Sequence, residues 1–136
     1  MDSEELRLRT KKYAGQVIRF VDNLPKGMAY DVIGRQLMRS ATSVAANCRA
    51  TCRARSKPDF VNKLGIVEEE ADETLFWLEM LIESGKCQES SVSALKKEAR
   101  EIVAIFSASR RTARLNRSYS HEAGFKGSIA DARHSN

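Results

Sequence analysis

The sequence predicts an all-α protein folded as an up-down-up-down antiparallel left-handed four-helix bundle. Only 2 prolines and 7 glycines interrupt 136 residues, and most of them fall where an apolar repeat of 3.6 residues breaks. Four amphipathic segments of roughly 20 to 27 residues, joined by loops of about 4 to 6, favour helices that pack antiparallel to their chain neighbours. A hydrophobic fraction of 42% can close one core, so residues 1–118 are expected to form a single domain.

The first two helices are predicted from apolar residues that return at helical spacing. The first should span about residues 3–23, followed by a turn at residues 24–27 that contains Pro25 and Gly27. The second should span about residues 28–53, because its apolar residues keep steps of three or four. They are Ile33, Leu37, Ala41, Val44, Cys48 and Cys52.

The third helix has the clearest start signal. Ser56 is a candidate N-cap, Pro58 suits a first turn, and Asp59 follows Ser56 at the spacing of a capping box. The apolar residues that follow alternate steps of four and three, which is the spacing of a left-handed bundle seam. They are Phe60, Leu64, Val67, Ala71, Thr74, Leu78 and Leu81. Gly85 should end this helix as a C-cap.

The fourth helix is expected to start at a cap formed by Ser90 or Ser91 and to fray near Arg117. Its buried side should consist of Val92, Leu95, Ala99, Ile102, Ile105, Phe106 and Ala113. Residues 119–136 have scattered small residues, two glycines and no sustained period, so a disordered polar tail is expected there.

Catalytic and metal-binding groups are sparse. His121 and His134, the 2 histidines, fall in the predicted tail, which argues against a rigid catalytic pair. Cys48 and Cys52 lie one helical turn apart and could share a metal, but two further zinc ligands are not in evidence. Their alternative role is that of small buried apolar residues. We therefore expect no enzyme activity, no cofactor and no metal. An N-terminus without an apolar stretch, in a chain without a membrane-spanning run, favours a cytoplasmic protein with no membrane partner.

Opposite charges are concentrated on the second and third predicted helices. Residues 32–58 hold 6 basic residues and no acidic one, whereas the third helix has no Lys or Arg between Lys63 and Lys86. The acidic residues between these two lysines are Glu68, Glu69, Glu70, Asp72, Glu73, Glu79 and Glu83. A carboxylate-bridged di-metal site would also need histidines within the helices, and the sequence places none there. Pairing between the two helices is the expected use of these charges.

The remaining basic residues are candidates for binding phosphates, because the chain carries a net charge of +5. The C-terminal ends of the second and fourth helices should lie at the same end of the bundle, where two clusters could merge into one basic cap. The candidates are Arg49, Arg53, Arg55, Lys57, Arg110, Arg111, Arg114 and Arg117. Tyr119 is the only nearby aromatic residue, so little sequence specificity is expected.

The stretch 74–82 is apolar on nearly every side, although one seam would need only Thr74, Leu78 and Leu81. Phe76, Trp77 and Met80 therefore need a second partner. A central place in the core could supply it, but a small bundle has little room to surround one helix. A homo-oligomer interface is at least as well supported.

The same segments resemble a known family. Residues 36–47, residues 52–56 with Phe60, and residues 69–74 followed by 77–79 are similar to the four-helix-bundle proteins encoded in 23S rRNA intervening sequences. The similarity spans about residues 10–118. It implies a bundle that assembles as a homopentamer and has no established enzymatic activity. A more distant relative is the accessory variability determinant of diversity-generating retroelements, a basic pentameric bundle that binds a reverse transcriptase and nucleic acid.

The resemblance also implies recurrent polar positions, at Arg39, Ser43, Asn47, Glu70 and Glu73. Ser43 and Asn47 lie one turn apart beside the seam of the second helix, and we expect these five residues to form a buried polar network with a structural role.

The expected function is a non-enzymatic, oligomeric bundle that binds RNA or another nucleic acid through arginine-rich patches. An alternative is a protein-interaction scaffold, such as an accessory subunit of a reverse transcriptase, that does not bind nucleic acid itself. A metal-carboxylate enzyme is a third hypothesis. A small-molecule substrate is not expected. Binding through phosphates would weaken steeply with added salt, which separates the first hypothesis from the second.

Overall fold

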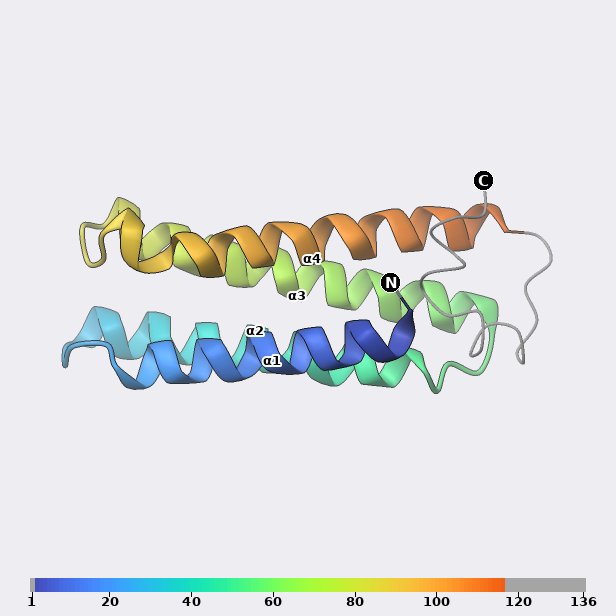
Figure 1. Cartoon of the computed structure of the whole chain (residues 1–136), viewed down its shortest axis with the longest axis horizontal. Coiled ribbons are helices and arrows are strands. Elements are labelled where there is room, and N and C mark those ends of the chain that lie inside the picture. Colours follow the sequence, from blue (N-terminus) through green and yellow to red (C-terminus); the bar gives the residue numbers. More distant parts are fainter. Residues whose placement is uncertain (1, 117–136) are drawn as a thin grey trace.

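The computed structural model describes residues 2–116, which form four α-helices. They are α1 (Ser3–Asp22), α2 (Met28–Thr51), α3 (Lys57–Glu83) and α4 (Glu89–Leu115). Each helix packs antiparallel beside the next one along the chain, so the predicted four-helix bundle is confirmed (Figure 1). Arg117 and the predicted tail, residues 119–136, lie outside the described residues.

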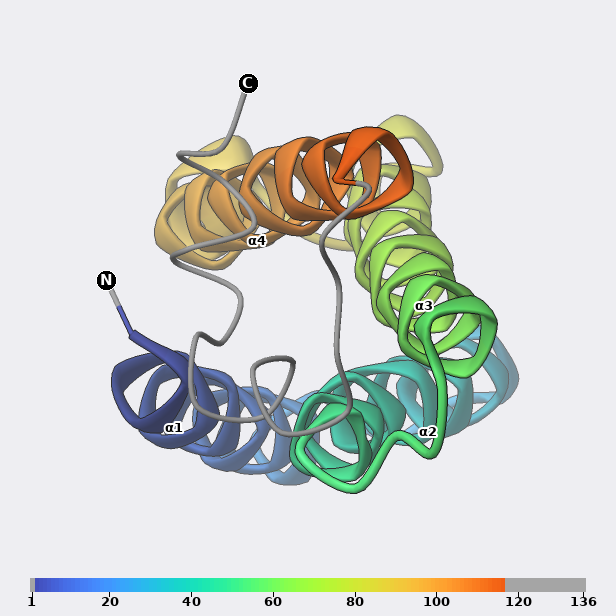
Figure 2. The same cartoon turned by 90° about the vertical axis from the view of Figure 1, so that its right-hand side faces the viewer.

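The end-on view places the helices in chain order around the core, with α1 across from α3 and α2 across from α4 (Figure 2). The start of α1, the end of α2, the start of α3 and the end of α4 therefore share one end of the bundle. This arrangement confirms that the C-terminal ends of α2 and α4 lie at the same end.

The capping of α3 follows the sequence signal. Ser56 is the N-cap, and its hydroxyl accepts a hydrogen bond from the backbone N–H of Asp59 at 3.2 Å. The carboxylate of Asp59 in turn accepts from the backbone N–H of Arg55 at 3.0 Å, which ties the preceding loop to the first turn. At the other end Gly85 has a φ of 76°, and the N–H of Lys86 donates to the carbonyl of Leu81 at 2.9 Å. The C-cap is Ser84, one residue before the predicted cap, and Gly85 follows it in the left-handed conformation that ends α3 in a Schellman turn.

The start of α4 differs from the prediction of a serine cap. The N-cap is Gln88, whose side chain makes no capping hydrogen bond, and Glu89 is the first helical residue. The Schellman turn is the reason, because the N–H of Cys87 also donates to the carbonyl of Leu81 and the chain has reversed direction by that point. Ser90 and Ser91 then fall inside the first turn, so the prediction that either serine caps α4 is wrong.

The core is built from the predicted seams. All seven seam residues of α3, from Phe60 to Leu81, are buried, and they pack against buried residues of the other three helices. Two buried hydroxyl groups join α2 to α3 within this core: Thr74 Oγ1 donates to Ser40 Oγ at 2.8 Å. Across the α1–α4 edge, Tyr13 donates to the carbonyl of Leu95 at 2.8 Å, and Arg9 donates twice to Glu98. Within residues 2–116, no helix is both long and apolar enough to cross a bilayer.

Candidate nucleic-acid interface

Two neighbouring arginines form a ridge near the C-terminal end of α2. Arg49 lies in the last turn of α2 and Arg53 lies just beyond that helix; both are exposed and form no ion pair within residues 2–116. A surface groove runs along each side of this ridge, and both arginines line both grooves. The ridge therefore presents two unpaired guanidinium groups to either side, which is a suitable arrangement for oxyanions such as phosphates.

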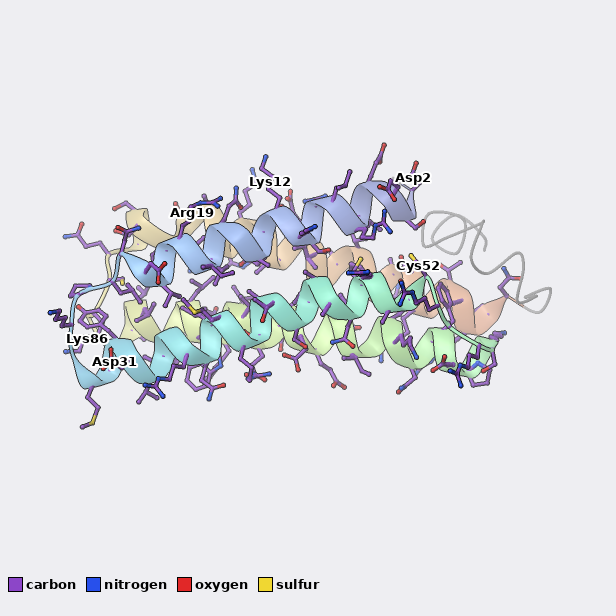
Figure 3. The ribbon with its side chains drawn as sticks, turned by 90° about the horizontal axis from the view of Figure 1, so that it is seen from below. Asp2, Lys12, Arg19, Asp31, Cys52 and Lys86 are labelled. Atoms are coloured by element: carbon purple, nitrogen blue, oxygen red, sulfur yellow. The ribbon has the colours of Figure 1, made fainter. Side chains whose placement is uncertain are left out.

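The α1–α2 groove encloses about 510 Å³ and is lined by Arg7, Leu8, Lys11, Ala45, Ala46, Arg49, Cys52 and Arg53. Its cations come from both helices, and its lining includes no acidic residue. Arg7 also forms an exposed ion pair with Glu4, three residues earlier on α1. Figure 3 shows Cys52 at the end of α2, close to the start of α1, where Asp2 is labelled.

The α2–α3 groove encloses about 480 Å³ and is lined by Ala46, Arg49, Ala50, Arg53, Arg55, Asp59 and Lys63. Asp59 accepts a hydrogen bond from Lys63 Nζ at 2.7 Å, and this contact is the main reason that the pKa of Asp59 lies below its usual value. One carboxylate thus stays ionised within this groove and offsets part of its positive charge.

Two of the predicted phosphate-binding residues, Lys57 and Arg110, contact neighbouring helices of the bundle. Lys57 Nζ donates to the carbonyls of Arg114 at 3.2 Å and Asn116, and so holds the end of α4 against the start of α3. Arg110 pairs with Glu68 of α3 at 3.0 Å. Both residues were predicted among the cations left over for phosphate binding, but in the structure each has a partner on a neighbouring helix. Their binding of phosphates stays a prediction.

The other predicted residues lie in two separate places. Arg49, Arg53 and Arg55 line the grooves, whereas Arg111 and Arg114 are exposed on α4 and line neither groove. Arg111 and Arg114 therefore belong to neither groove, and the joining of the two clusters into one basic cap at the shared end of the bundle stays a prediction. Arg117 is outside the described residues.

Three groove cations were missed by the sequence reasoning, namely Arg7, Lys11 and Lys63. A signal for the first two was present. Arg7 and Lys11 share a face of α1 at a spacing of four residues, and an antiparallel neighbour places the start of α1 beside the end of α2. Lys63 gave no comparable signal, because an i, i+4 pair with Asp59 is the usual reading of its position.

The predicted polar network separates into two groups. Arg39 bridges Glu70, at 3.0 Å, and Glu73, and Trp77 Nε1 donates to Glu73 at 3.1 Å. The Trp77 hydrogen bond, followed by that of Arg39, lowers the pKa of Glu73. The second group is Asn47, whose amide donates to the carbonyl and the hydroxyl of Ser43, both at 2.9 Å.

The expectation that this network is buried is wrong. The side chain of Arg39 is 46% exposed. Its neighbour Ser40 takes the buried position and meets Thr74 inside the α2–α3 seam, which leaves Arg39 and Glu73 on the outer side of that seam. The predicted charge pairing between α2 and α3 is nevertheless present.

The predicted interface residues differ in exposure. Phe76 is 48% exposed, while Trp77 and Met80 are half-buried against the core. The rings of Phe76 and Trp77 meet edge to face with centroids 4.9 Å apart. Phe76 is therefore the member of this set that the bundle itself covers least.

The cysteines occupy different environments. Cys48 is buried, and burial raises the pKa of its thiol to about 11, whereas Cys52 is half-buried at the α1–α2 groove. In the part of the chain that the structure describes, no three Cys, His, Asp or Glu side chains are grouped so as to hold a metal ion. The predicted apolar role of Cys48 agrees with its burial, since it joins the hydrophobic core cluster.

Comparison with known proteins identifies the family of this chain. The family model described as the 23S rRNA-intervening sequence protein matches residues 5–108. The chain belongs to this family. A 1.70 Å crystal structure of a protein of unknown function from the S23 ribosomal protein family of Bacteroides thetaiotaomicron is similar, with a TM-score of 0.66 and 31% identity. That similarity covers 74% of this chain and 94% of the other. A comparison with curated proteins gives no significant match.

The family match includes both grooves. All of their lining residues lie between residues 5 and 108, whereas Arg110, Arg111 and Arg114 of α4 follow the matched range. The residues that line the two grooves therefore lie within the segment that matches the 23S rRNA-intervening sequence protein family.

Proposed function

We propose that this chain is a non-enzymatic nucleic-acid-binding protein that assembles as a homopentamer and contacts RNA or DNA through the ridge of Arg49 and Arg53. The observation that carries the proposal is that both arginines are exposed, form no ion pair within residues 2–116, and line both basic grooves. Unpaired guanidinium groups can bind two phosphate oxygens each and release the counterions of the nucleic acid.

The overall charge supports the same partner. A net charge of +5 attracts polyanions, and the grooves beside the ridge add Arg7, Lys11 and Arg55. The lining of neither groove includes an aromatic residue on which a base could stack. Binding should therefore depend on the phosphate backbone and carry little sequence preference.

The pentamer rests on the resemblance and on Phe76. An aromatic side chain that is about half exposed on α3, beside the half-buried Trp77 and Met80, offers an apolar contact to a second copy. No residue of α3, the helix that carries Phe76, lines the α1–α2 groove, so assembly through Phe76 and nucleic-acid binding in that groove use different helices.

The decisive experiment measures binding of RNA against ionic strength for the wild type and for the Arg49→Gln/Arg53→Gln variant. The logarithm of the association constant should fall linearly with the logarithm of salt concentration, and the variant should bind more weakly with a shallower slope. A variant with the same charge loss on α4, Lys97→Gln/Arg100→Gln, is the matched control and should keep the wild-type slope. Salt-independent binding, or equal slopes for all three proteins, would refute the proposal.

Light scattering behind size exclusion, with the A260/A280 ratio read on the same peak, tests the assembly. We expect a pentamer-sized peak that carries nucleic acid at low salt and loses it at high salt. A monomer would contradict both the pentamer and the role given to Phe76.

A protein-interaction scaffold is the second candidate, and the exposed Phe76 favours it independently of the arginines. In that case a clean oligomer without nucleic acid would elute at low salt. Its partner would then bind with an affinity that changes little with added salt.

A further inference from the structure

The two walls of the α1–α2 groove carry matching rows of cations. Arg7 and Lys11 are one helical turn apart on α1, which places their Cβ atoms about 5–6 Å apart on one helix face. On the other side, Arg49 lies in the last turn of α2 and Arg53 lies two residues beyond Thr51, the last residue of that helix. Each wall therefore presents two positive charges at successive positions along the groove.

Between the walls the groove is apolar. Leu8 is 58% exposed, and Ala45, Ala46 and Cys52 complete the lining without adding a charge. The α2–α3 groove differs in charge, because its lining includes the ionised carboxylate of Asp59, which binds Lys63. Of the two grooves, the α1–α2 groove has the stronger unopposed positive charge.

We infer that the α1–α2 groove holds a single-stranded segment of nucleic acid, with its phosphates between the α1 and α2 rows of cations and its sugars and bases over Leu8. This inference rests on the proposed function and names the strand type and its place.

The apolar floor of the groove favours a single strand. The bases of a duplex are paired and stacked inside it, whereas the bases of a single strand are free to contact an exposed apolar side chain such as Leu8. A duplex would meet the cations of the two rows but leave Leu8 uncovered by bases. Arg7 does not obstruct this path, because its ion pair with Glu4 is exposed on both sides and a phosphate can replace it.

The cysteines of the chain give a footprint of this site. Cys52 lines the groove and Cys48 is buried. Cys87 directly follows Lys86, which Figure 3 labels at the opposite end of the bundle from Cys52. We would measure the rate at which N-ethylmaleimide alkylates each thiol of the full chain, alone and with saturating poly(U) or with the duplex poly(A)·poly(U). Binding of each probe is followed separately by sedimentation.

We expect poly(U) to slow the alkylation of Cys52 several-fold while the rate at Cys87 stays unchanged, and the duplex to leave both rates unchanged. If poly(U) binds without protecting Cys52, the groove assignment is overturned although nucleic-acid binding stands. If the duplex protects Cys52 as well as poly(U) does, the single-strand assignment is overturned. If neither probe binds, the proposed function itself fails.

A charge series tests the α1 wall by a second route. In Arg7→Gln/Lys11→Gln two phosphate contacts are lost, so the slope of log affinity for poly(U) against log salt should decrease by about 1.4, at about 0.7 per contact for single strands. The matched control is Lys12→Gln/Lys97→Gln. Lys12 is next to Lys11 in sequence, but it points away from α2 (Figure 3) and acts on Glu98 of α4.

Both double variants lose two positive charges. The substituted lysines are exposed and Arg7 belongs to an exposed ion pair, so both variants should fold. Circular dichroism checks this before binding is compared. An equal slope for the two variants would overturn the assignment of Arg7 and Lys11 to the binding surface. Lys11→Arg, which keeps the charge, should retain the wild-type slope.

Discussion

The buried hydroxyl pair between α2 and α3 makes an asymmetric prediction about stability. Ser40 and Thr74 are fully buried, and Thr74 Oγ1 lies 2.8 Å from both Ser40 Oγ and the carbonyl of Glu70. Ser40 Oγ has a second, long contact of 3.4 Å with the carbonyl of Leu37. Thr74 therefore has a good alternative acceptor on its own helix, whereas Ser40 depends on Thr74 for its short contact.

The two single substitutions should differ in cost. Thr74→Val keeps the shape of the side chain but leaves the Ser40 hydroxyl without its short partner, so we expect a loss of about 1.5 kcal/mol within the range of about 1–3 for an unsatisfied buried group. Ser40→Ala leaves Thr74 free to donate to Glu70, so the loss should be nearer 0.5 kcal/mol. The double variant removes both polar groups together and should cost no more than Thr74→Val alone.

The assay is guanidinium unfolding followed by circular dichroism, with the four proteins compared at one protein concentration because oligomers unfold in a concentration-dependent way. The cycle should give a coupling of about 0.5 kcal/mol or more between the two sites. Additive effects within about 0.3 kcal/mol, or a larger loss for Ser40→Ala than for Thr74→Val, would refute the reasoning.

Three further predictions concern packing and charge. Arg110→Ala should lower the free energy of unfolding by about 1–3 kcal/mol, because Glu68, whose side chain is 18% exposed, loses its cation, and RNA affinity should stay unchanged in the same titration. Arg9 holds the pKa of Glu98 below its ordinary value of 4.5. The stability that this pair adds is complete well above pH 4.5 and is lost as the pH falls through the lowered pKa, so melting temperatures of Glu98→Gln should depend less on pH below that point than those of the wild type. Gly34→Ala would place a Cβ 2.9 Å from Val21 Cγ1, so about 1–3 kcal/mol of overpacking should outweigh a gain of about 1 kcal/mol in helix propensity. In the Gly34→Ala background, Val21→Ala should lower the melting temperature less than it does in the wild type, because it removes the clashing methyl group. Melting-temperature shifts that simply add would contradict the clash.

The sequence is sufficient for the architecture because the signals for each helix are local. The alternating steps from Phe60 to Leu81 define one face of α3, and Ser56 and Gly85 mark its ends through their own backbone and hydroxyl chemistry. The start of α4 was mispredicted because serine is a favoured N-cap, so the local signal favours Ser90 or Ser91 over Gln88. The tight turn after Gly85, which depends on hydrogen bonds back to Leu81, instead starts the helix directly after Gln88.

The surface could be predicted only in part. Opposite runs of charge on adjacent helices predicted the pairing of Arg39 with Glu70 and Glu73, because antiparallel neighbours bring those runs together. The roles of Lys57 and Arg110 depend on which carbonyl or carboxylate lies within reach across a helix interface, and a one-dimensional pattern does not contain that distance. The cations that contact other helices can therefore be told from those that are open to a ligand only once the fold is known.

Trp77 makes intrinsic fluorescence sensitive to the surface around Phe76 and not to the α1–α2 groove. It is the only tryptophan of the chain, its indole N–H is bound by Glu73, and its ring touches the exposed Phe76. Because α3 does not border the α1–α2 groove, intrinsic fluorescence should change when Phe76 is covered by another subunit and remain constant when a strand occupies the groove. Emission and thiol reactivity can therefore follow assembly and nucleic-acid binding separately in one sample.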